Sequence, residues 1–297
     1  MKICSVIVTF NRKELLVRCV RKCLEQNVEN DVLIFDNHST DGTKEYLADL
    51  GYIDNPRIIY YFSSENLGGS GGFSNGLKMA YDKGYDFIWL MDDDGYPFHS
   101  DALKEDIDAY NKLGVKNVVI NSLVVSEDCE TLSFKTGGFE TKNSVKKAYP
   151  EGYMFDAISP FNGTLYSREI VERIGFPRSD FFIKGDETEY TYRAKSKGIK
   201  MVTVINSEFH HPIMPSSYRR FLIFNIGFGE EAYWKEYYKA RNYVYIYRTY
   251  FSKIQLLKHV LNSVRKCMLY KEDKKRKIRY TLKGLKDGFA NRFENIM

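Results

Sequence analysis

Short apolar runs alternate with amphipathic stretches through the first hundred positions of the chain. The runs are rich in β-branched and aromatic residues, which is typical of buried strands. They predict strands over residues 3–10, 32–37, 57–62 and 86–91. Apolar residues at helical spacing predict helices over residues 13–26, 39–50 and 73–84. Strand–helix alternation with short connections favours an α/β fold with a parallel sheet, right-handed crossovers and flanking helices.

The pattern is less regular after residue 115. Residues 115–165 are expected to form strands and loops, and helices resume over 167–175 and 186–197. After a strand-like run that ends near residue 212, the chain is expected to be helical and aromatic, then basic. We therefore expect an α/β domain over residues 1–225 and a helical, basic extension over residues 226–297.

Composition supports a large folded core and shows an uneven distribution of charge. Hydrophobic residues make up 43% of the 297 residues and aromatic residues 15%, enough for one large domain with an appendage. Residues 252–297 hold 13 Lys and Arg against 4 Asp and Glu, a net charge of +9, whereas the rest of the chain carries −4. This asymmetry predicts that the tail meets an anionic surface.

Several features indicate a reducing, aqueous compartment. The five cysteines are odd in number and lack metal-like spacing, which favours reduced thiols and a cytoplasmic location. The N-terminal apolar run has no small-residue cleavage site, so we interpret it as a strand and not as a signal peptide. No run approaches the roughly 20 apolar residues that a spanning helix needs. A soluble protein, or one bound at a membrane surface, is therefore expected.

Three consecutive aspartates, Asp92, Asp93 and Asp94, directly follow the fourth predicted strand. Carboxylates crowded beside a buried strand repel one another and are costly to desolvate. Oxygen ligands at this spacing suit a hard divalent cation such as Mg²⁺ or Mn²⁺. A solvated turn is the simpler alternative, but three acids are more than a turn needs. The segment therefore favours a metal site at the strand end, where such sheets bind ligands.

A glycine-rich stretch, residues 66–76, lies between the third strand and the following helix. We interpret it as a turn whose backbone approaches a ligand closely, next to a helix N-terminus that favours anions. It is not a phosphate loop, because no Gly-Lys-Ser/Thr follows, and its glycines miss the dinucleotide-binding register. A flexible tight turn without a ligand is an alternative of equal weight.

Two later segments carry further titratable groups. Asp186 and Glu187 follow an aromatic run and a glycine, a position that suits a general base, whereas Glu189 fits a helix N-terminus stabilised by the helix dipole. His210 and His211 end a strand-like run beside a proline. A histidine pair in a chain with five histidines is a candidate for metal or phosphate binding.

The order of these motifs resembles that of the inverting family 2 glycosyltransferases, which have the GT-A fold. The shared segments are SVIVTFNR, FDNHSTDGT, NLGGSGGF, WLMDDDGYP, GDETEY with the arginine after it, and FHHP. The glycine-rich turn together with MDDD resembles the galactofuranosyltransferase and rhamnosyltransferase-like branch, and the resemblance covers residues 1–242. Single motifs are weak, but six in one order are strongly specific. The expected fold is a GT-A, Rossmann-like, mostly parallel sheet flanked by helices, with a C-terminal helical, basic extension.

The resemblance implies a nucleoside-diphosphate-sugar donor, with UDP or dTDP, and a divalent metal, Mn²⁺ or Mg²⁺. It implies donor contacts at Thr9, Asn11, Arg12, Asp36, Asn66, Gly68, Gly69, Asp92 and Asp93. Asp36 matches the acid that holds the nucleotide base. Asp92 and Asp94 match the D-x-D pair for ribose and metal–diphosphate contacts. His210 matches an additional metal ligand, and His211 is the neighbour that could be the true one.

The base that deprotonates the acceptor falls on Glu187, six residues before Arg193, where the family usually has Asp. Either Glu187 acts in a reshaped pocket or the neighbouring Asp186 is the base. The implied reaction is an inverting, in-line displacement at the anomeric carbon, with the metal neutralising charge on the departing diphosphate. The expected sugar is galactofuranose first and rhamnose second, added to a lipid-linked glycan in surface polysaccharide synthesis.

The tail combines two patterns. Apolar residues at helical spacing predict a helix packed on the domain: Ile254, Leu257, Val260, Leu261, Val264 and Met268. The basic stretch after them suits an anionic lipid surface, at about 1 kcal/mol per basic residue, and no nucleic-acid motif accompanies it. We therefore expect peripheral contact with the inner face of a membrane and no nucleic acid partner. A homo-oligomer is compatible with the sequence.

Two other classes share parts of this pattern. A nucleotidyltransferase of similar fold would need a glycine- and basic-rich phosphate loop after the first strand, and VTFNRKELL does not provide one. A non-catalytic sugar-nucleotide-binding protein would be expected to lose the acids or the base, and both are present. The glycosyltransferase prediction is therefore preferred.

Overall fold

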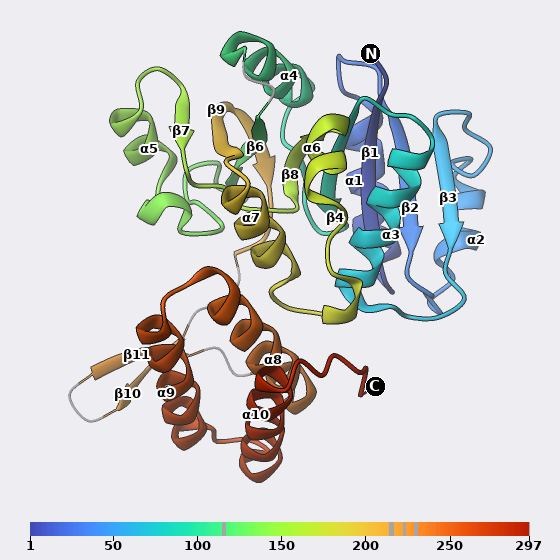
Figure 1. Ribbon diagram of the computed structural model, residues 1–297. Helices are drawn as coiled ribbons and strands as arrows, with labels where there is room; N and C mark the ends of the chain where they lie inside the picture. The colour runs from blue at the N-terminus through green and yellow to red at the C-terminus, as the bar shows by residue number, and fades with distance from the viewer. Residues whose placement is uncertain (115–116, 214–216, 222–223, 229–230, 297) are drawn as a thin grey trace. The chain divides into compact units, whose positions relative to one another are not determined.

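The computed structural model describes residues 1–114, 117–213, 217–221, 224–228 and 231–296. The chain divides into two compact units (Figure 1). The first unit comprises Met1–Gly68, Gly72–Phe176 and Ala194–Ile213, and the second comprises Gly69–Gly71, Pro177–Arg193 and Met214–Met297. The domain boundary expected after residue 225 stays a prediction.

The first unit is built on a mixed sheet of nine strands. The strands are β1 (Ile3–Thr9), β2 (Asp31–Asp36), β3 (Ile58–Phe62), β4 (Phe87–Asp92), β5 (Tyr96–Pro97), β6 (Val118–Val125), β7 (Tyr153–Phe155), β8 (Asn162–Ser167) and β9 (Lys200–His210). The helices that accompany them are α1 (Lys13–Leu24), α2 (Thr43–Asp49), α3 (Gly68–Asp82), α4 (Ala102–Leu113), α5 (Lys142–Ala148), α6 (Arg168–Ile174) and α7 (Asp186–Ser196). α3 and α7 each contribute residues to both units.

The strands follow the order β3-β2-β1-β4-β8-β6-β9-β5, with β7 beside β9. β1 pairs in parallel with β2 and β4, and β2 pairs in parallel with β3, so the parallel half of the prediction is confirmed. β8 runs antiparallel to β4 and β6, which makes the sheet as a whole mixed. The chain leaves β1 for β2 on one side, whereas β4 lies on the other side. Such a switch point is where open α/β sheets bind their ligands.

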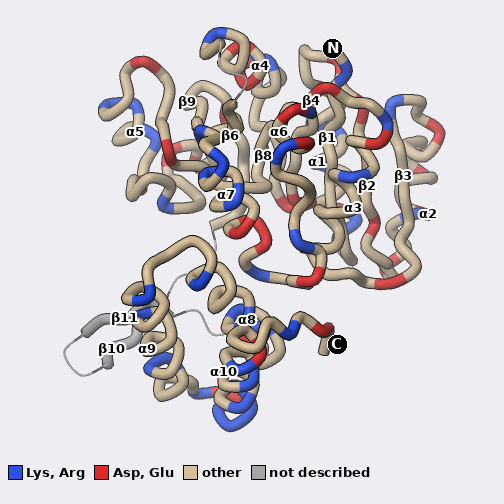
Figure 2. The backbone as a smooth tube through the Cα atoms, viewed as in Figure 1, with Lys and Arg blue, Asp and Glu red and all other residues tan. Residues whose placement is uncertain are grey.

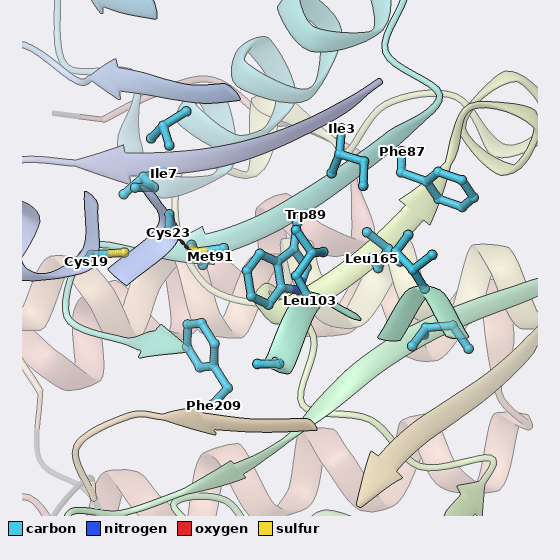
Figure 3. Packing of buried hydrophobic residues seen from close by; sticks show 14 of the residues in the cluster. Ile3, Ile7, Cys19, Cys23, Phe87, Trp89, Met91, Leu103, Leu165 and Phe209 are labelled. Atoms are coloured by element: carbon cyan, nitrogen blue, oxygen red, sulfur yellow. Dashed lines mark hydrogen bonds between the residues drawn. The ribbon is translucent and has the colours of Figure 1, made fainter. Parts of the chain in front are cut away.

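Figure 3 shows the core around β1, β4 and α1. Trp89 is fully buried, and its ring lies edge-on to Phe209 with the ring centroids 6.3 Å apart. Cys19 and Cys23 are buried on the inner face of α1, and Cys23 Sγ lies 3.4 Å from Met91 Sδ. The Cys23–Met91 contact joins α1 to β4, and the Trp89–Phe209 contact joins β4 to β9.

The glycine-rich stretch is the start of a helix, which corrects the predicted turn. α3 begins at Gly68. A Cβ atom on Gly72 would lie 2.5 Å from Val8 Cγ1, and one on Gly76 would lie 2.7 Å from Val6 Cγ1. Val6 and Val8 share one face of β1 because side chains alternate along a strand. The glycines therefore let α3 lie close against β1.

Two further segments differ from expectation. α5 lies in the region predicted to hold strands and loops, and Thr141 caps it by accepting a hydrogen bond from Ser144 N at 3.2 Å. Strands β10 (Ser217–Phe221) and β11 (Phe224–Phe228) form an antiparallel hairpin before the expected helices begin. Segments of seven and five residues are too short to show a clear period.

The second unit holds three C-terminal helices, α8 (Tyr233–Tyr250), α9 (Lys253–Leu269) and α10 (Lys274–Phe289), which confirms the predicted helical, basic extension. α10 lies against α8 at close range. A Cβ atom on Gly284 would collide with the backbone oxygen of Tyr237, and one on Gly288 would lie 2.6 Å from that of Arg241. Across the described ranges, no helix combines the length and the apolar character needed to cross a membrane.

Candidate functional site

The carboxyl ends of β1 and β4 lie side by side at the switch point. Val8 pairs with Asp92 in the parallel register, which brings Thr9 next to the aspartates. The Thr9 hydroxyl donates to Asp93 Oδ2 at 2.7 Å. Because Asp93 is only 3% exposed, this hydrogen bond ties the two strand ends together inside the molecule.

Arg12, which precedes α1, places a positive charge beside the aspartates. Its Nη1 donates to Asp93 Oδ1 at 3.1 Å and to Asp94 Oδ2 at 2.7 Å. Burial disfavours the guanidinium charge, but the charges of Asp93 and Asp94 outweigh burial and raise the pKa of Arg12. The Arg12 side chain is 49% exposed and that of Asp93 is 4% exposed, so the guanidinium reaches from solvent to a buried carboxyl group.

The three carboxyl groups carry more negative charge than Arg12 neutralises. Burial, reinforced by Asp94 and Asp93, raises the pKa of Asp92 to about 8. Burial also raises the pKa of Asp93 to about 6, although the charge of Arg12 acts against it. Burial disfavours ionisation of Asp94 as well, but His211 and Arg12 outweigh it, so the pKa of Asp94 is lowered. Protein groups alone therefore leave the cluster short of positive charge.

His211 lies beside Asp94, just past the end of β9. Its Nε2 is 3.4 Å from Asp94 Oδ1, and its Nδ1 is 2.7 Å from the carbonyl oxygen of Pro212. Burial lowers the pKa of His211, but the neighbouring Asp94 outweighs burial and raises it. A proton on Nδ1 satisfies the Pro212 carbonyl, and a cation that replaced the proton on Nε2 would find that nitrogen directed toward Asp94. Gly95 lets the chain pass close to the end of β9, because a Cβ atom there would lie 2.9 Å from the backbone oxygen of His210.

His210 occupies a different environment. Its ring stacks on Tyr96 with the centroids 4.5 Å apart, and the Arg18 guanidinium lies 4.5 Å from the Tyr96 ring centre. Both ring nitrogens are buried and make no hydrogen bond within the described residues. Burial also lowers the pKa of His210. The structure thus brings His211 to Asp94, whereas the resemblance favoured His210.

The aspartates and His211 fit a divalent cation whose remaining ligands come from a diphosphate. Within the described part of the chain, no three His, Cys, Asp or Glu side chains form a ready-made metal cage. Asp94 Oδ1, however, is buried and makes no hydrogen bond to any described residue. Mg²⁺ commonly takes one or two carboxylates and completes its shell with phosphate oxygens and water. The carboxylate oxygens and the histidine nitrogen suit such a site, in which the protein supplies only some of the metal ligands.

Asp36, at the end of β2, is fully buried, and both of its oxygens accept hydrogen bonds. Ser39 N donates to Oδ1 at 2.7 Å, and the Tyr60 hydroxyl donates to Oδ2 at 2.6 Å. Asn11 has a φ of 55°, and its Oδ1 accepts from Thr40 N at 2.7 Å. These bonds shape the loop between β2 and α2. The nucleotide contacts expected of Asp36 and Asn11 stay predictions.

Asn37, a residue absent from the predicted site, organises the start of α3. Its Oδ1 accepts from Leu67 N at 2.9 Å, and its Nδ2 donates to Gly68 O at 2.9 Å and to Asn66 Oδ1 at 3.1 Å. Gly68 has a φ of 69°, which favours glycine. Gly69 belongs to the second unit, and a Cβ atom there would meet nothing within 4 Å. The signal for Asn37 was its place at the carboxyl end of a predicted strand.

Asp186 and Glu187 open α7 in the second unit. Asp186 is 5% exposed, and burial, followed by the charge of Glu187, raises the pKa of Asp186 well above its usual value. Carboxyl groups this close favour one shared proton over two charges. Glu189, by contrast, accepts hydrogen bonds from Arg193 Nε at 3.1 Å and from the Tyr250 hydroxyl at 2.7 Å. Glu189 is therefore structural, and the Asp186–Glu187 pair is available for proton transfer.

Arg241 and Asn242 of α8 hold the loop that leads into α7, and neither was among the predicted site residues. Arg241 is fully buried, and its Nη2 donates to the carbonyl oxygens of Asp180 and Phe181 at 2.9 and 3.0 Å. Asn242 Nδ2 lies within 3.0 Å of three carbonyl oxygens, those of Phe181, Ile183 and Lys184. Arg and Asn are usually exposed, so their residue types alone do not show that these two positions are buried.

Comparisons with known proteins identify the family of the chain. The model of the family described as glycosyl transferase family 2 matches residues 4–175. The chain is 29% identical to galactofuranosyltransferase GlfT1 of Mycolicibacterium smegmatis over 222 residues, which cover 71% of this chain and 70% of that protein. It is 28% identical to the GalNAc(5)-diNAcBac-PP-undecaprenol beta-1,3-glucosyltransferase of Campylobacter jejuni over 148 residues, 49% of this chain and 46% of that one.

A solved structure shows the same fold. Mannosyltransferase PcManGT of Pyrobaculum calidifontis, in complex with GDP-Man and Mn²⁺, matches with a TM-score of 0.57 at 14% identity. The match covers 98% of this chain and 88% of that one. The predicted GT-A architecture is therefore confirmed.

Proposed function

The chain belongs to glycosyl transferase family 2, and on that premise we propose that it transfers galactofuranose from a nucleoside-diphosphate donor to a lipid-linked glycan. The similarity to a galactofuranosyltransferase supports this sugar, and rhamnose is the second candidate. The donor nucleotide is UDP or dTDP. The product is a growing surface polysaccharide.

The observation that carries the proposal is the cluster of Asp92, Asp94 and His211 at the switch point of the sheet. A bound Mn²⁺ or Mg²⁺ would neutralise the charge that develops on the departing diphosphate. Asp92 and Asp94 would hold the ion through carboxylate oxygens, and His211 Nε2 is the nitrogen placed to join them. Arg12 orients Asp94, and Asp93 fixes the strand end that carries both ligands.

Glu187 is the residue that we assign to deprotonation of the acceptor. Burial, followed by the charge of Glu187, raises the pKa of Asp186 well above its usual value, which favours the protonated form of Asp186 and supports Glu187 as the base. In an inverting transfer the acceptor oxygen loses its proton as it attacks the anomeric carbon. The bond from that carbon to the diphosphate oxygen breaks in the same displacement, so no covalent enzyme intermediate is needed.

The acceptor and the place of action follow from two observations. The Campylobacter jejuni relative is named for an undecaprenol-diphosphate-linked acceptor, which supports a lipid-linked acceptor here. The net charge of +9 over residues 252–297 supports contact with an anionic membrane surface. We therefore propose a cytoplasmic enzyme that works at the inner face of the membrane.

Isothermal titration of the chain with UDP and with dTDP, with and without Mn²⁺, tests the donor site. Metal-dependent binding of one nucleotide is expected, and no metal-enhanced binding of either would sink the proposal. A donor-hydrolysis screen over UDP- and dTDP-sugars then identifies the sugar. A non-catalytic sugar-nucleotide-binding protein would bind the donor without turnover, and a nucleotidyltransferase would instead release pyrophosphate from a nucleoside triphosphate.

A further inference from the structure

α9 presents a row of large apolar side chains to solvent. The row, called the α9 stripe below, consists of Ile254, Leu257, Leu261, Val264 and Met268, which are 67%, 59%, 46%, 42% and 50% exposed. Steps of three and four residues place them on one face of the helix, roughly 80° wide. Five exposed side chains on one face form a continuous apolar surface and not scattered single residues.

The α9 stripe is not the side by which the helix is held. Leu256 and Val260 pack against Ala240 and Val244 of α8 and against Leu285 of α10. The sequence prediction of a helix packed on the domain is therefore right for Val260 and wrong for the five residues of the stripe. The physical reason is that α9 has two apolar faces, and the fold uses the other one.

Positive charge flanks the α9 stripe on both sides. Lys258 and Arg265 are exposed and lie roughly 60–80° from the centre of the stripe, and Lys253 lies roughly 60° away on the opposite side. α9 contains four basic residues and no acidic residue. Figure 2 shows that Lys and Arg continue along α10. The surface around the stripe therefore complements an anion.

We propose that the α9 stripe lies in the headgroup region of an anionic lipid bilayer, with the helix axis parallel to the membrane surface. A helix in this position buries its apolar face at the boundary between the headgroups and the acyl chains, while flanking lysines and arginines reach up to the phosphates. A protein partner would have to pair each flanking cation with a carboxylate, whereas anionic lipids surround the whole helix with countercharge.

This inference rests on the proposed function, because a membrane contact serves an enzyme whose acceptor is linked to a lipid. A lipid-linked acceptor is confined to the membrane, and α9 would bring the enzyme to it. Insertion is assigned to the α9 stripe, and the basic residues of α10 add only charge attraction. Lipid binding itself requires neither donor nor acceptor, so it is measured independently of catalysis.

Co-sedimentation of the full chain with vesicles of phosphatidylglycerol and phosphatidylcholine tests the inference. Leu257→Glu is expected to lower partition into the pellet at least about tenfold, because it removes an inserted side chain and adds repulsion. Leu50→Glu is the matched control, since Leu50 is 49% exposed at the end of α2 and its substitution leaves partition unchanged. Thermal melts followed by circular dichroism verify that both variants fold.

Insertion has a spectroscopic signature of its own. In an Ile254→Trp variant, tryptophan emission is expected to shift to the blue on addition of the vesicles. Unchanged partition of Leu257→Glu overturns the inference, because surface charge alone then explains binding. A wild-type dimer that Leu257→Glu converts to a monomer, without vesicle binding, also overturns it, since the stripe is then a contact between copies.

Donor hydrolysis without vesicles separates this inference from the proposed function. Leu257→Glu is expected to keep that activity, because α9 carries none of the assigned site residues. Vesicle binding by a wild-type chain that hydrolyses no sugar nucleotide would overturn the enzyme assignment and leave the membrane surface in place.

Discussion

His211 Nε2 lies 3.4 Å from Asp94 Oδ1, and this pair joins the end of β9 to the end of β4. The two strands are not neighbours in the sheet, so the approach depends on the chain between Asp94 and Tyr96. Gly95 permits it by leaving no side chain against the backbone of His210. The nitrogen and oxygen donors of the proposed metal site thus come from distant segments that one glycine brings together.

His211→Ala is expected to raise the Mn²⁺ concentration needed for half-maximal nucleotide binding at least about tenfold, an effect typical of weakened metal sites. His210→Phe is the matched control, and little change is expected because Phe can keep the stack on Tyr96. Calorimetric titration of Mn²⁺ at fixed nucleotide measures both. The opposite ranking would assign the metal ligand to His210.

Glu187→Gln is expected to leave donor binding unchanged and to lower turnover at least about a hundredfold, since general-base catalysis commonly contributes about 10²–10⁴-fold. Asp94→Asn should instead weaken metal-dependent donor binding. Asp186→Asn should cost less turnover than Glu187→Gln, because burial favours the protonated form of Asp186, which Asn resembles. Steady-state kinetics combined with calorimetry distinguish the three, and a greater loss in Asp186→Asn would move the base to Asp186.

Asn242→Ala is expected to lower kcat while leaving donor affinity unchanged. Asn242 holds a loop in which Phe182 and Lys184 have φ values of 63° and 70°, a conformation that non-glycine residues adopt only when held. Its loss leaves buried carbonyls unpaired at a cost of about 1–3 kcal/mol. Asn262→Ala, on the exposed side of α9, is the control. A lower melting temperature with unchanged kcat would limit Asn242 to a structural role.

Gly72→Ala is expected to lower the free energy of unfolding by about 1–3 kcal/mol, because the added Cβ atom would lie 2.5 Å from Val8 Cγ1 in a packed interface. Gly69→Ala lies at a position with open space, so it should raise the free energy of unfolding by about 0.4–1 kcal/mol. Urea denaturation measures both. Equal effects would mean that α3 does not need its close approach to β1.

Asp106→Asn is expected to change how stability depends on pH. Asp106 is fully buried in α4, and burial raises its pKa to about 8, although the Ser122 hydroxyl donates to its Oδ2 at 2.9 Å. Between about pH 4 and 8 the folded chain therefore holds a proton that the unfolded chain has lost. The contribution of Asp106 to the free energy of unfolding therefore falls as pH rises, by about 1.4 kcal/mol per pH unit in this window.

The Asn side chain cannot ionise, so the stability of Asp106→Asn relative to wild type should increase from pH 5 to pH 8. Denaturant unfolding at several pH values within that window provides the measurement. Parallel stability profiles for the two proteins would show that Asp106 is charged in the folded state.

The parallel half of the fold could be predicted because β1 and β4 are continuous apolar runs and α1 has one apolar face. The three aspartates could be predicted as site residues because three adjacent negative charges directly after a buried strand are unusual. The start of α3 at Gly68 could not be predicted, since Gly72 meets Val8 only in three dimensions. His210 and His211 could not be separated either, because neighbouring side chains of an extended chain face opposite ways and the sequence does not show which side meets Asp94.

Gly284 and Gly288 belong to the side of α10 that packs against α8, which is distinct from the side that carries its positive charge. The side that faces α8 admits no side chain at these two positions, because a Cβ atom would meet the backbone of Tyr237 or Arg241. The exposed lysines and arginines lie elsewhere on the helix. A full substitution scan should therefore find two intolerant positions within a permissive helix. The surface charge of α10 can therefore change without repacking of the helices beneath it.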